Sequence, residues 1–351
     1  MKLIHTADIH LGMQPDKQQP WAELREKEIW ETFGRLMDEC NRREAELLLI
    51  AGDLFHRQPL VRELREVNYQ FSRLERTKVV LIAGNHDYIG SRSNYADFPW
   101  AEHVTMLSGE ELQTVRFPEL SAAVTGFSYH TRDISEARLR DVRAQGGEIA
   151  VLLAHGGDPK DVPIDFKRLA LAGFDYAALG HIHKPQKLAD GMFYAGSLEP
   201  LDKNETGEHG YVFAEIDLLP DGKKEVRTEF VPFAKRRYVD LTVPVTPEDT
   251  NGSIQERTKR LLAAEGEENL FRIVLEGSRE EHLAPDIGAL AKLGYVTEVR
   301  DETLPEYDFE AIRAANHDNL IGMYIDRIQG IEPQDEVTKK ALYYGLKALL
   351  D

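Results

Sequence analysis

The sequence of 351 residues contains one cysteine, Cys40, and has no run of about 18 apolar residues. A single cysteine excludes an internal disulfide, which is typical of a protein from a reducing compartment. Without a long apolar run we expect no membrane span. Because His5, Asp8 and His10 interrupt the apolar N-terminus, we also expect no signal peptide. Together these absences predict a cytoplasmic protein.

Positive charge is also scarce, with 43 Lys and Arg against 61 Asp and Glu, a net charge of -18 at pH 7. A protein that wraps nucleic acid by charge alone is expected to be basic. Any contact with a polyanion must therefore be local, through a basic patch or bound cations. Residues 56–78 carry six Lys or Arg against three Glu. This stretch is a candidate phosphate-backbone track or dimer helix, although a solvated helix face accounts for it equally well.

The pattern of apolar residues predicts an α/β protein with two domains. Short apolar stretches at 47–51, 78–83, 149–154 and 176–180 alternate with segments of helical spacing, as in layered α/β folds. Pro and basic residues at 232–237 indicate a linker. Strands at 238–243, 269–277 and 295–300, with helical stretches near 252–264 and 282–293, predict a smaller second α/β unit. We expect domains at 1–233 and 238–325, then a helical tail at 326–351 with a leucine face that packs on its own domain or docks a partner.

Polar clusters follow five of the predicted strands, nearly always beside a glycine. In open α/β sheets, binding sites form at the carboxyl ends of the strands, and glycine lets backbone and ligand come close. Two pairs of these residues are two positions apart, so each pair points to one side of an extended segment. The candidate residues are Asp8, His10, Asp53, His56, Asn85, His86, Asp87, His155, His181 and His183.

These residue types point to metal chemistry. Two aspartates, an asparagine and up to four imidazoles suit manganese, iron or zinc, whereas magnesium and calcium prefer oxygen ligands alone. One ion with an open position would not use them all, but two ions about 3.5–4 Å apart with a bridging carboxylate would. Such a pair lowers the pKa of a bound water and neutralises a phosphate group, which predicts phosphoester hydrolysis. Singly, each residue could instead be structural, as a turn-forming Asp or a core His.

The motifs D-x-H, G-D, G-N-H-D, H and G-H-x-H occur in this order over residues 1–185 and resemble those of the calcineurin-like metallophosphoesterase superfamily. Within it, HTADIHLG, GDLFH, AGNHD, GHIHKPQ and YAGSLEP are similar to segments of SbcD-type DNA repair exonucleases. The resemblance implies a four-layer α/β/β/α sandwich followed by a small α/β capping domain. It also implies a DNA nuclease with two divalent ions, manganese being the expected metal. The implied partners are DNA, an SbcC-like coiled-coil ATPase subunit and a second copy in a homodimer.

The resemblance further implies a division of the metal ligands. One ion would be held by one set of three residues, the other by a second set, and a carboxylate would bridge them. The sets are Asp8, His10 and His183 for one ion, Asn85, His155 and His181 for the other, and Asp53 as the bridge.

Three further residues receive roles from the resemblance. His86 would donate a proton to the leaving oxygen or stabilise charge on the phosphate, and Asp87 would orient its ring. His56 would lie near the substrate phosphate. Two other functions stay open: a phosphoesterase for small nucleotides or phosphoproteins, which the acidic composition suits, and a mainly structural subunit of an ATPase, which the leucine face of the tail suits.

Overall fold

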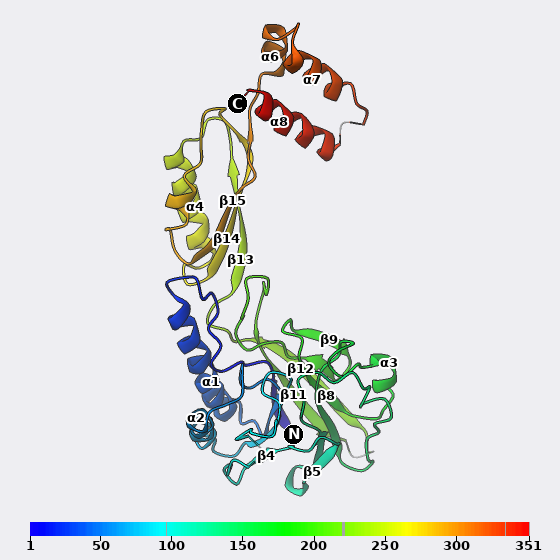
Figure 1. Ribbon diagram of the computed structural model, residues 1–351. Helices are drawn as coiled ribbons and strands as arrows, with labels where there is room; N and C mark the ends of the chain where they lie inside the picture. Colours follow the sequence, from blue (N-terminus) through cyan, green and yellow to red (C-terminus); the bar gives the residue numbers. More distant parts are fainter. Residues whose placement is uncertain (96, 220–221, 334, 351) are drawn as a thin grey trace. The chain divides into compact units, whose positions relative to one another are not determined.

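The structure is a computed structural model that describes residues 1–95, 97–219, 222–333 and 335–350 (Figure 1). The chain divides into two compact units, Met1–Tyr238 and Val239–Asp351. The first unit contains two six-stranded sheets and the second a four-stranded sheet followed by three helices.

The first sheet has the strand order β12-β11-β1-β2-β3-β4. Its parallel part is β1 (Lys2–Thr6), β2 (Leu47–Ala51), β3 (Lys78–Ile82) and β4 (Val104–Met106), and the long hairpin β11 (Gly210–Leu218) and β12 (Lys224–Pro232) adds to it antiparallel. Because β1, β2 and β3 are parallel, their carboxyl ends lie at the same edge.

The second sheet has the order β5-β6-β7-β8-β10-β9. β6 (Ala122–Gly126), β7 (Ile149–His155), β8 (Tyr176–Gly180) and β10 (Met192–Tyr194) are parallel, and the edge strands β5 (Gln113–Phe117) and β9 (Gln186–Ala189) run antiparallel to their neighbours.

Three hydrophobic clusters hold the layers together. Leu47 and Leu49 face the second sheet, whereas Leu48 and Ile50 face the helices α1 (Ala22–Arg43) and α2 (Val61–Phe71). This alternation explains why β2 is apolar at every position: both of its faces are buried. The outer face of the second sheet is covered by residues 127–142 and by the short helix α3 (Phe166–Leu169). The predicted four-layer sandwich is therefore confirmed, with a fourth layer that is mostly irregular.

The chain passes into the second unit along β13 (Tyr238–Val245), which pairs with β14 (Leu270–Arg279). β14 pairs in parallel with β15 (Val296–Asp301) and β16 (Leu304–Pro305). α4 (Asn251–Glu265) is capped at its N-terminus by Thr250, whose side chain accepts from the Ser253 N–H. The helix expected at 282–293 is wrong in extent, because only α5 (Ile287–Leu290) forms there. A proline inside a helix lacks the backbone N–H and clashes with the carbonyl of the preceding turn. Pro285 therefore restricts this helix to the residues that follow it.

The last three helices, α6 (Phe309–Ala315), α7 (Leu320–Gln329) and α8 (Glu336–Leu350), have a small core of their own. Leu342 and Leu346 of α8 pack there with Ile325 and Tyr307. The leucine face of the tail is thus largely used within the chain, although Leu350 is 40% exposed. In the described part of the chain, every helix is too short or too polar to cross a bilayer.

Gly180, the last residue of β8 (Tyr176–Gly180), lies in close contact with the first sheet. A Cβ at this position would overlap the carbonyl oxygen of Ala51 in β2 and would lie 2.9 Å from the Ala7 Cβ and 3.0 Å from the His155 Nδ1. A backbone carbonyl held in a sheet has little freedom to move aside. Glycine is therefore required here by a close approach of two strands.

We predict that Gly180→Ala lowers the free energy of unfolding by about 1–3 kcal/mol or more, because the added methyl group overpacks the sheet interface. Gly146→Ala is the matched control, since a Cβ there meets nothing within 4 Å. It should change stability by less than about 0.5 kcal/mol. Urea unfolding of the metal-free protein measures both, and equal midpoints for the two variants would contradict the close approach.

Candidate active site

The strand ends of both sheets meet at one place. Asp8 follows β1 and Asp53 follows β2, and the backbone N–H of His10 donates to the Asp53 carbonyl at 3.0 Å. The backbone N–H of His181, just after β8 in the second sheet, donates to both oxygens of the Asp8 carboxylate at 3.0 Å. A buried side chain of one sheet thus fixes the loop of the other. The site therefore lies at the edge of the sandwich where these strand ends of the two sheets meet.

Four of the candidate residues have left-handed backbone. Their φ angles are 50° for Asp8, 53° for His10, 50° for Asp53 and 97° for His181. Such angles are uncommon for residues other than glycine, cost about 1–3 kcal/mol each when strained, and cluster at functional sites. The surrounding hydrogen bonds over-determine these conformations, which turn the side chains toward one another.

Asp53 lies at the centre of the cluster and is 1% exposed. Its Oδ1 accepts the backbone N–H of His86 at 2.9 Å. Its Oδ2 is 3.6 Å from the His10 Nε2 and 3.5 Å from the His155 Nε2. One carboxylate oxygen therefore faces two imidazoles that come from different sheets.

The first imidazole belongs to a group of Asp8, His10 and His183, whose ligand atoms lie within 4.8 Å of one another. The His10 Nε2 is 3.2 Å from the His183 Nε2. The other nitrogen of His183, Nδ1, is 2.7 Å from the Glu205 Oε1. Because a carboxylate only accepts, the Nδ1 carries the hydrogen, and the Nε2 of a neutral ring is left with a lone pair.

The second imidazole belongs to a group of Asp8, Asp53 and His155, whose ligand atoms also lie within 4.8 Å. The His155 Nδ1 donates to the Ala51 carbonyl at 2.9 Å, so the Nε2 of the neutral ring is an acceptor. That Nε2 is 2.9 Å from the Asn85 Oδ1.

The His155 Nε2, an acceptor in the neutral ring, therefore faces two further acceptors, the Asn85 Oδ1 and the buried Asp53 Oδ2. A bound cation resolves this arrangement, and the donors are those that divalent ions such as manganese, iron or zinc take. The residues present thus fit a dinuclear metal centre. Their individual roles as ligands remain a prediction.

His181 has partners that the sequence did not suggest. Its Nε2 is 2.9 Å from the Asp158 Oδ2 and 3.8 Å from the Asp161 Oδ2. Its ring lies 5.2 Å from that of His155, measured between centroids. Asp158 could have been noticed three residues after His155, at a strand end, whereas Glu205 follows no strand signal.

Burial and neighbouring charges shift several pKa values. Burial raises the pKa of the Asp8 carboxyl, against the opposing influence of His155 and His183. Burial lowers the pKa of His10, and the neighbouring imidazoles lower it further, so this ring is neutral at pH 7 and able to act as a ligand. Burial opposes the charge of His183, but the hydrogen bond to Glu205 and the nearby carboxylates raise its pKa to about 9.

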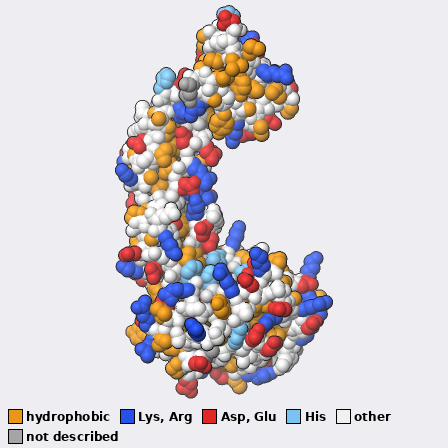
Figure 2. All heavy atoms as spheres, viewed as in Figure 1, with side chains coloured by type: hydrophobic (Ala, Val, Ile, Leu, Met, Phe, Trp, Pro, Cys, Tyr) orange, Lys and Arg blue, Asp and Glu red, His pale blue; other side chains and the backbone are white. Residues whose placement is uncertain are grey.

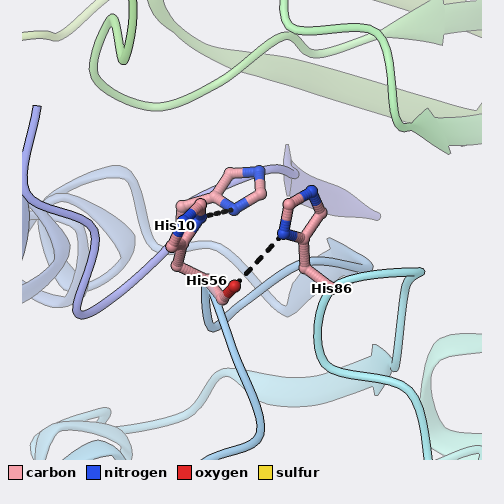
Figure 3. A group of neighbouring side chains, drawn as sticks. All are labelled: His10, His56 and His86. Carbon is pink, nitrogen blue, oxygen red and sulfur yellow. Dashed lines mark hydrogen bonds between the residues drawn. The ribbon is translucent and has the colours of Figure 1, made fainter. Parts of the chain in front are cut away.

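His56 and His86 lie beside His10 (Figure 3). The His86 Nδ1 donates to the carbonyl oxygen of His56 at 3.1 Å, and the His56 Nδ1 is 3.3 Å from the His10 Nδ1. The rings of His56 and His86 stack with centroids 5.0 Å apart. Both side chains are half-buried, and histidines gather in a patch on the face of the first unit in Figure 2.

Asp87 has different partners from those expected. Its Oδ1 accepts the backbone N–H of Gly84 at 2.7 Å, and its Oδ2 accepts the N–H of Phe55 at 3.1 Å and the hydroxyl of Tyr95 at 3.2 Å. The His86 Nδ1 is bonded to a backbone carbonyl instead. The expectation that Asp87 orients the His86 ring is therefore corrected: this carboxylate holds together the loops after β2 and β3.

Comparison with known proteins agrees with these observations. Residues 1–185 match the calcineurin-like phosphoesterase family. The chain belongs to this family. The sequence-based assignment is thus confirmed, and the chain is a metallophosphoesterase with candidate His and Asp metal-binding groups.

Individual relatives are distant in sequence. The chain is 30% identical over 262 residues to the DNA double-strand break repair protein Mre11 of Methanocaldococcus jannaschii, covering 69% of each chain. It is 28% identical over 311 residues to the uncharacterized metallophosphoesterase YhaO of Bacillus subtilis, covering 81% of this chain and 73% of the relative. It is 25% identical over 299 residues to the SbcD component of the nuclease SbcCD of Staphylococcus epidermidis, covering 74% and 75%.

We predict that manganese raises the melting temperature of the protein and that Asp53→Asn abolishes this rise, because the carboxylate oxygen that faces both His10 and His155 is lost. Stabilisation by a bound ligand amounts to about 2.7 kcal/mol at a hundred times its dissociation constant. The control is Asp190→Asn, whose side chain is fully exposed. Calorimetric melting curves with and without manganese measure the rise in melting temperature. A rise in Asp53→Asn as large as that of the wild-type protein would be incompatible with a central role for this residue.

Asp87→Asn should lower the free energy of unfolding by about 1–3 kcal/mol, because an amide group offers one acceptor where the carboxylate offers two. Manganese uptake should persist in this variant. Urea unfolding of the metal-free protein gives the first quantity and equilibrium dialysis the second. Unchanged stability together with a loss of turnover would restore a catalytic role for Asp87.

Proposed function

We propose that this protein is a metal-dependent DNA nuclease that hydrolyses phosphodiester bonds at a dinuclear centre. The observation that carries the proposal is the position of the Asp53 Oδ2, which lies 3.6 Å from the His10 Nε2 and 3.5 Å from the His155 Nε2. A carboxylate oxygen that faces one imidazole of each ligand group suits a bridge between two ions. DNA as the substrate is supported by the similarity to Mre11 and to the SbcD component of SbcCD.

In this proposal the ligands divide as the family resemblance implies: Asp8, His10 and His183 around one ion, Asn85, His155 and His181 around the other, and Asp53 between them. Bound ions would lower the pKa of a water and offset the charge of the phosphate. Manganese is the proposed metal, since mixed nitrogen and oxygen donors suit it. The positive charge of two ions would also let an acidic protein receive a nucleic acid.

His86 is the proposed proton donor or charge stabiliser at the scissile phosphate. Its Nδ1 is occupied by the His56 carbonyl, so the Nε2 is the nitrogen left for substrate. Figure 3 shows this second nitrogen on the side of the ring away from the His56 carbonyl. The backbone N–H of His86 is tied to Asp53, which fixes the imidazole relative to the proposed metal centre. His56, stacked on His86, is the proposed neighbour of the substrate phosphate.

The partners in this proposal are an SbcC-like coiled-coil ATPase subunit and a second copy of the chain. Support comes from the staphylococcal relative, which is one component of a nuclease. The domain limits remain as the sequence suggests, a nuclease domain at 1–233, a capping domain at 238–325 and a tail at 326–351.

A second candidate is a phosphoesterase for small nucleotides or phosphoproteins. The net charge of -18 favours it, because a small substrate needs no extended basic surface. The same residues would act on it. Rapid turnover of a cyclic nucleotide or a phosphopeptide, with DNA left intact, would favour this function over the nuclease.

We predict that the purified protein cleaves labelled single- or double-stranded DNA in the presence of manganese, and that His86→Ala slows cleavage by about 10²–10⁴-fold, the usual contribution of a general acid or base. Manganese binding should be retained, because His86 is not a proposed ligand. His282→Ala, at an exposed position in the second unit, is the control.

The measurements of manganese binding and of DNA cleavage test the role of His86 and the nuclease activity separately. Loss of manganese binding in His86→Ala would mean that His86 is a ligand rather than a proton donor. Intact DNA with the wild-type protein, with and without an SbcC-like partner, would reject the nuclease.

A further inference from the structure

The two histidines at 181 and 183 are each held at one ring nitrogen by a carboxylate, and the two carboxylates differ in how firmly they are fixed. We propose that Glu205 and Asp158 are positioning residues that make the two metal sites unequal, so that the ion bound with His183 enters first and more tightly than the ion bound with His181. The inference rests on the proposed dinuclear centre and adds to it an order of filling.

Glu205 is fixed on both of its oxygens. The Oε1 is 2.7 Å from the His183 Nδ1, and the Oε2 accepts the Leu201 N–H at 2.9 Å and the Ser197 hydroxyl at 3.3 Å. The carbonyl of Glu205 is 3.2 Å from the Nε2 of the buried His209. The Glu205 side chain is 19% exposed. The Glu205 carboxylate that holds the His183 ring is therefore fixed in its orientation.

Asp158 is held less firmly. Its Oδ2 is 2.9 Å from the His181 Nε2, and its Oδ1 accepts the backbone N–H groups of Lys160 and Asp161 at 2.7 and 3.1 Å. These last bonds form a local turn within one loop. The Asp158 side chain is 42% exposed, so water competes for the oxygen that faces His181.

Asp161 gives His181 a second possible partner. Its Oδ2 is 3.8 Å from the same His181 Nε2, and its Oδ1 is buried without a hydrogen-bond partner among the described residues. The His181 Nε2 thus has two carboxylates within 4 Å, whereas the His183 Nδ1 has one well-fixed acceptor.

These contacts affect metal binding through the histidines. A carboxylate that accepts the hydrogen of one ring nitrogen fixes the tautomer and the orientation of the ring, and its removal typically costs about 10–100-fold in metal affinity. With the Nδ1 of His183 bonded to Glu205, the Nε2 is the nitrogen left for an ion, which displaces the second proton of the ring when it binds. With the Nε2 of His181 bonded to Asp158, the Nδ1 is the nitrogen left for an ion. The better-fixed ring loses less freedom when an ion binds, which favours the site of His183.

Glu205→Gln and Asp158→Asn separate the two sites. An amide has one acceptor, so each variant turns an NH₂ group toward either the histidine N–H or the local backbone N–H. The matched controls are Glu208→Gln, whose side chain lies in the same loop and is 53% exposed, and the fully exposed Asp190→Asn. Glu205→Asp keeps the charge on a shorter side chain and should give an intermediate affinity.

The experiment is an equilibrium titration of the full-length, metal-free protein with manganese, with free manganese read from its six-line electron paramagnetic resonance signal. We expect two ions per wild-type chain in two resolved steps. Glu205→Gln should weaken the tighter step by about 10–100-fold, whereas Asp158→Asn should leave the tighter step and weaken the second by a similar factor. Both control variants should follow the wild type.

Two identical steps in the wild-type chain, or a Glu205→Gln curve that matches that of Glu208→Gln in a variant with unchanged circular dichroism, would overturn the inference. A third ion that disappears in Asp158→Asn would also overturn it, since Asp158 would then be a ligand. If the wild-type chain bound no manganese at all, the proposed function itself would fail, which is a distinguishable result.

Discussion

The buried carboxylate of Asp53, faced by two imidazole nitrogens, is the constraint on which the rest of the site depends. An ionised carboxylate out of water is costly unless a cation or several donors compensate it. Here one oxygen is compensated by the His86 N–H, and the other faces His10 and His155, each of which belongs to a separate group of possible ligands. The first unit thus places this oxygen where a bound cation would compensate its charge.

The packing of the two sheets consequently also determines the geometry of the site. His155 ends a strand of the second sheet, yet its Nδ1 is bonded to Ala51 of the first. Asp8 follows a strand of the first sheet and fixes the backbone of His181 in the second. Gly180 keeps the strands close enough for these bonds. A change in the spacing of the sheets would therefore move the ligands of both groups at once.

Much of this arrangement could be predicted from the sequence, because the signals are local. β2 is apolar at every position since both faces are buried, and the candidate ligands follow parallel strands whose ends meet. What could not be predicted depends on contacts between distant loops. Glu205 lies 22 positions from His183 in a segment without periodicity, and its role is visible only once the chain is folded.

The same limit explains the corrected partner of Asp87. In the sequence it is adjacent to His86, and neighbours in a chain suggest a pair. In the structure successive side chains in the loop point in different directions, so Asp87 turns inward to Gly84, Phe55 and Tyr95. The helix expected at 282–293 failed for another local reason, since Pro285 interrupts a stretch that otherwise has helical composition.

The separate core of α6, α7 and α8 has a practical consequence for truncating the chain. Leu342 and Leu346 of α8 cover Ile325 of α7, which is 0% exposed. A chain shortened before α8 would leave that isoleucine and its neighbours uncovered, and such a fragment would tend to aggregate whatever else it had lost. Shortened forms meant to reveal the task of the C-terminal helices are best cut ahead of all three, so that a lost activity reflects a missing surface rather than a damaged one.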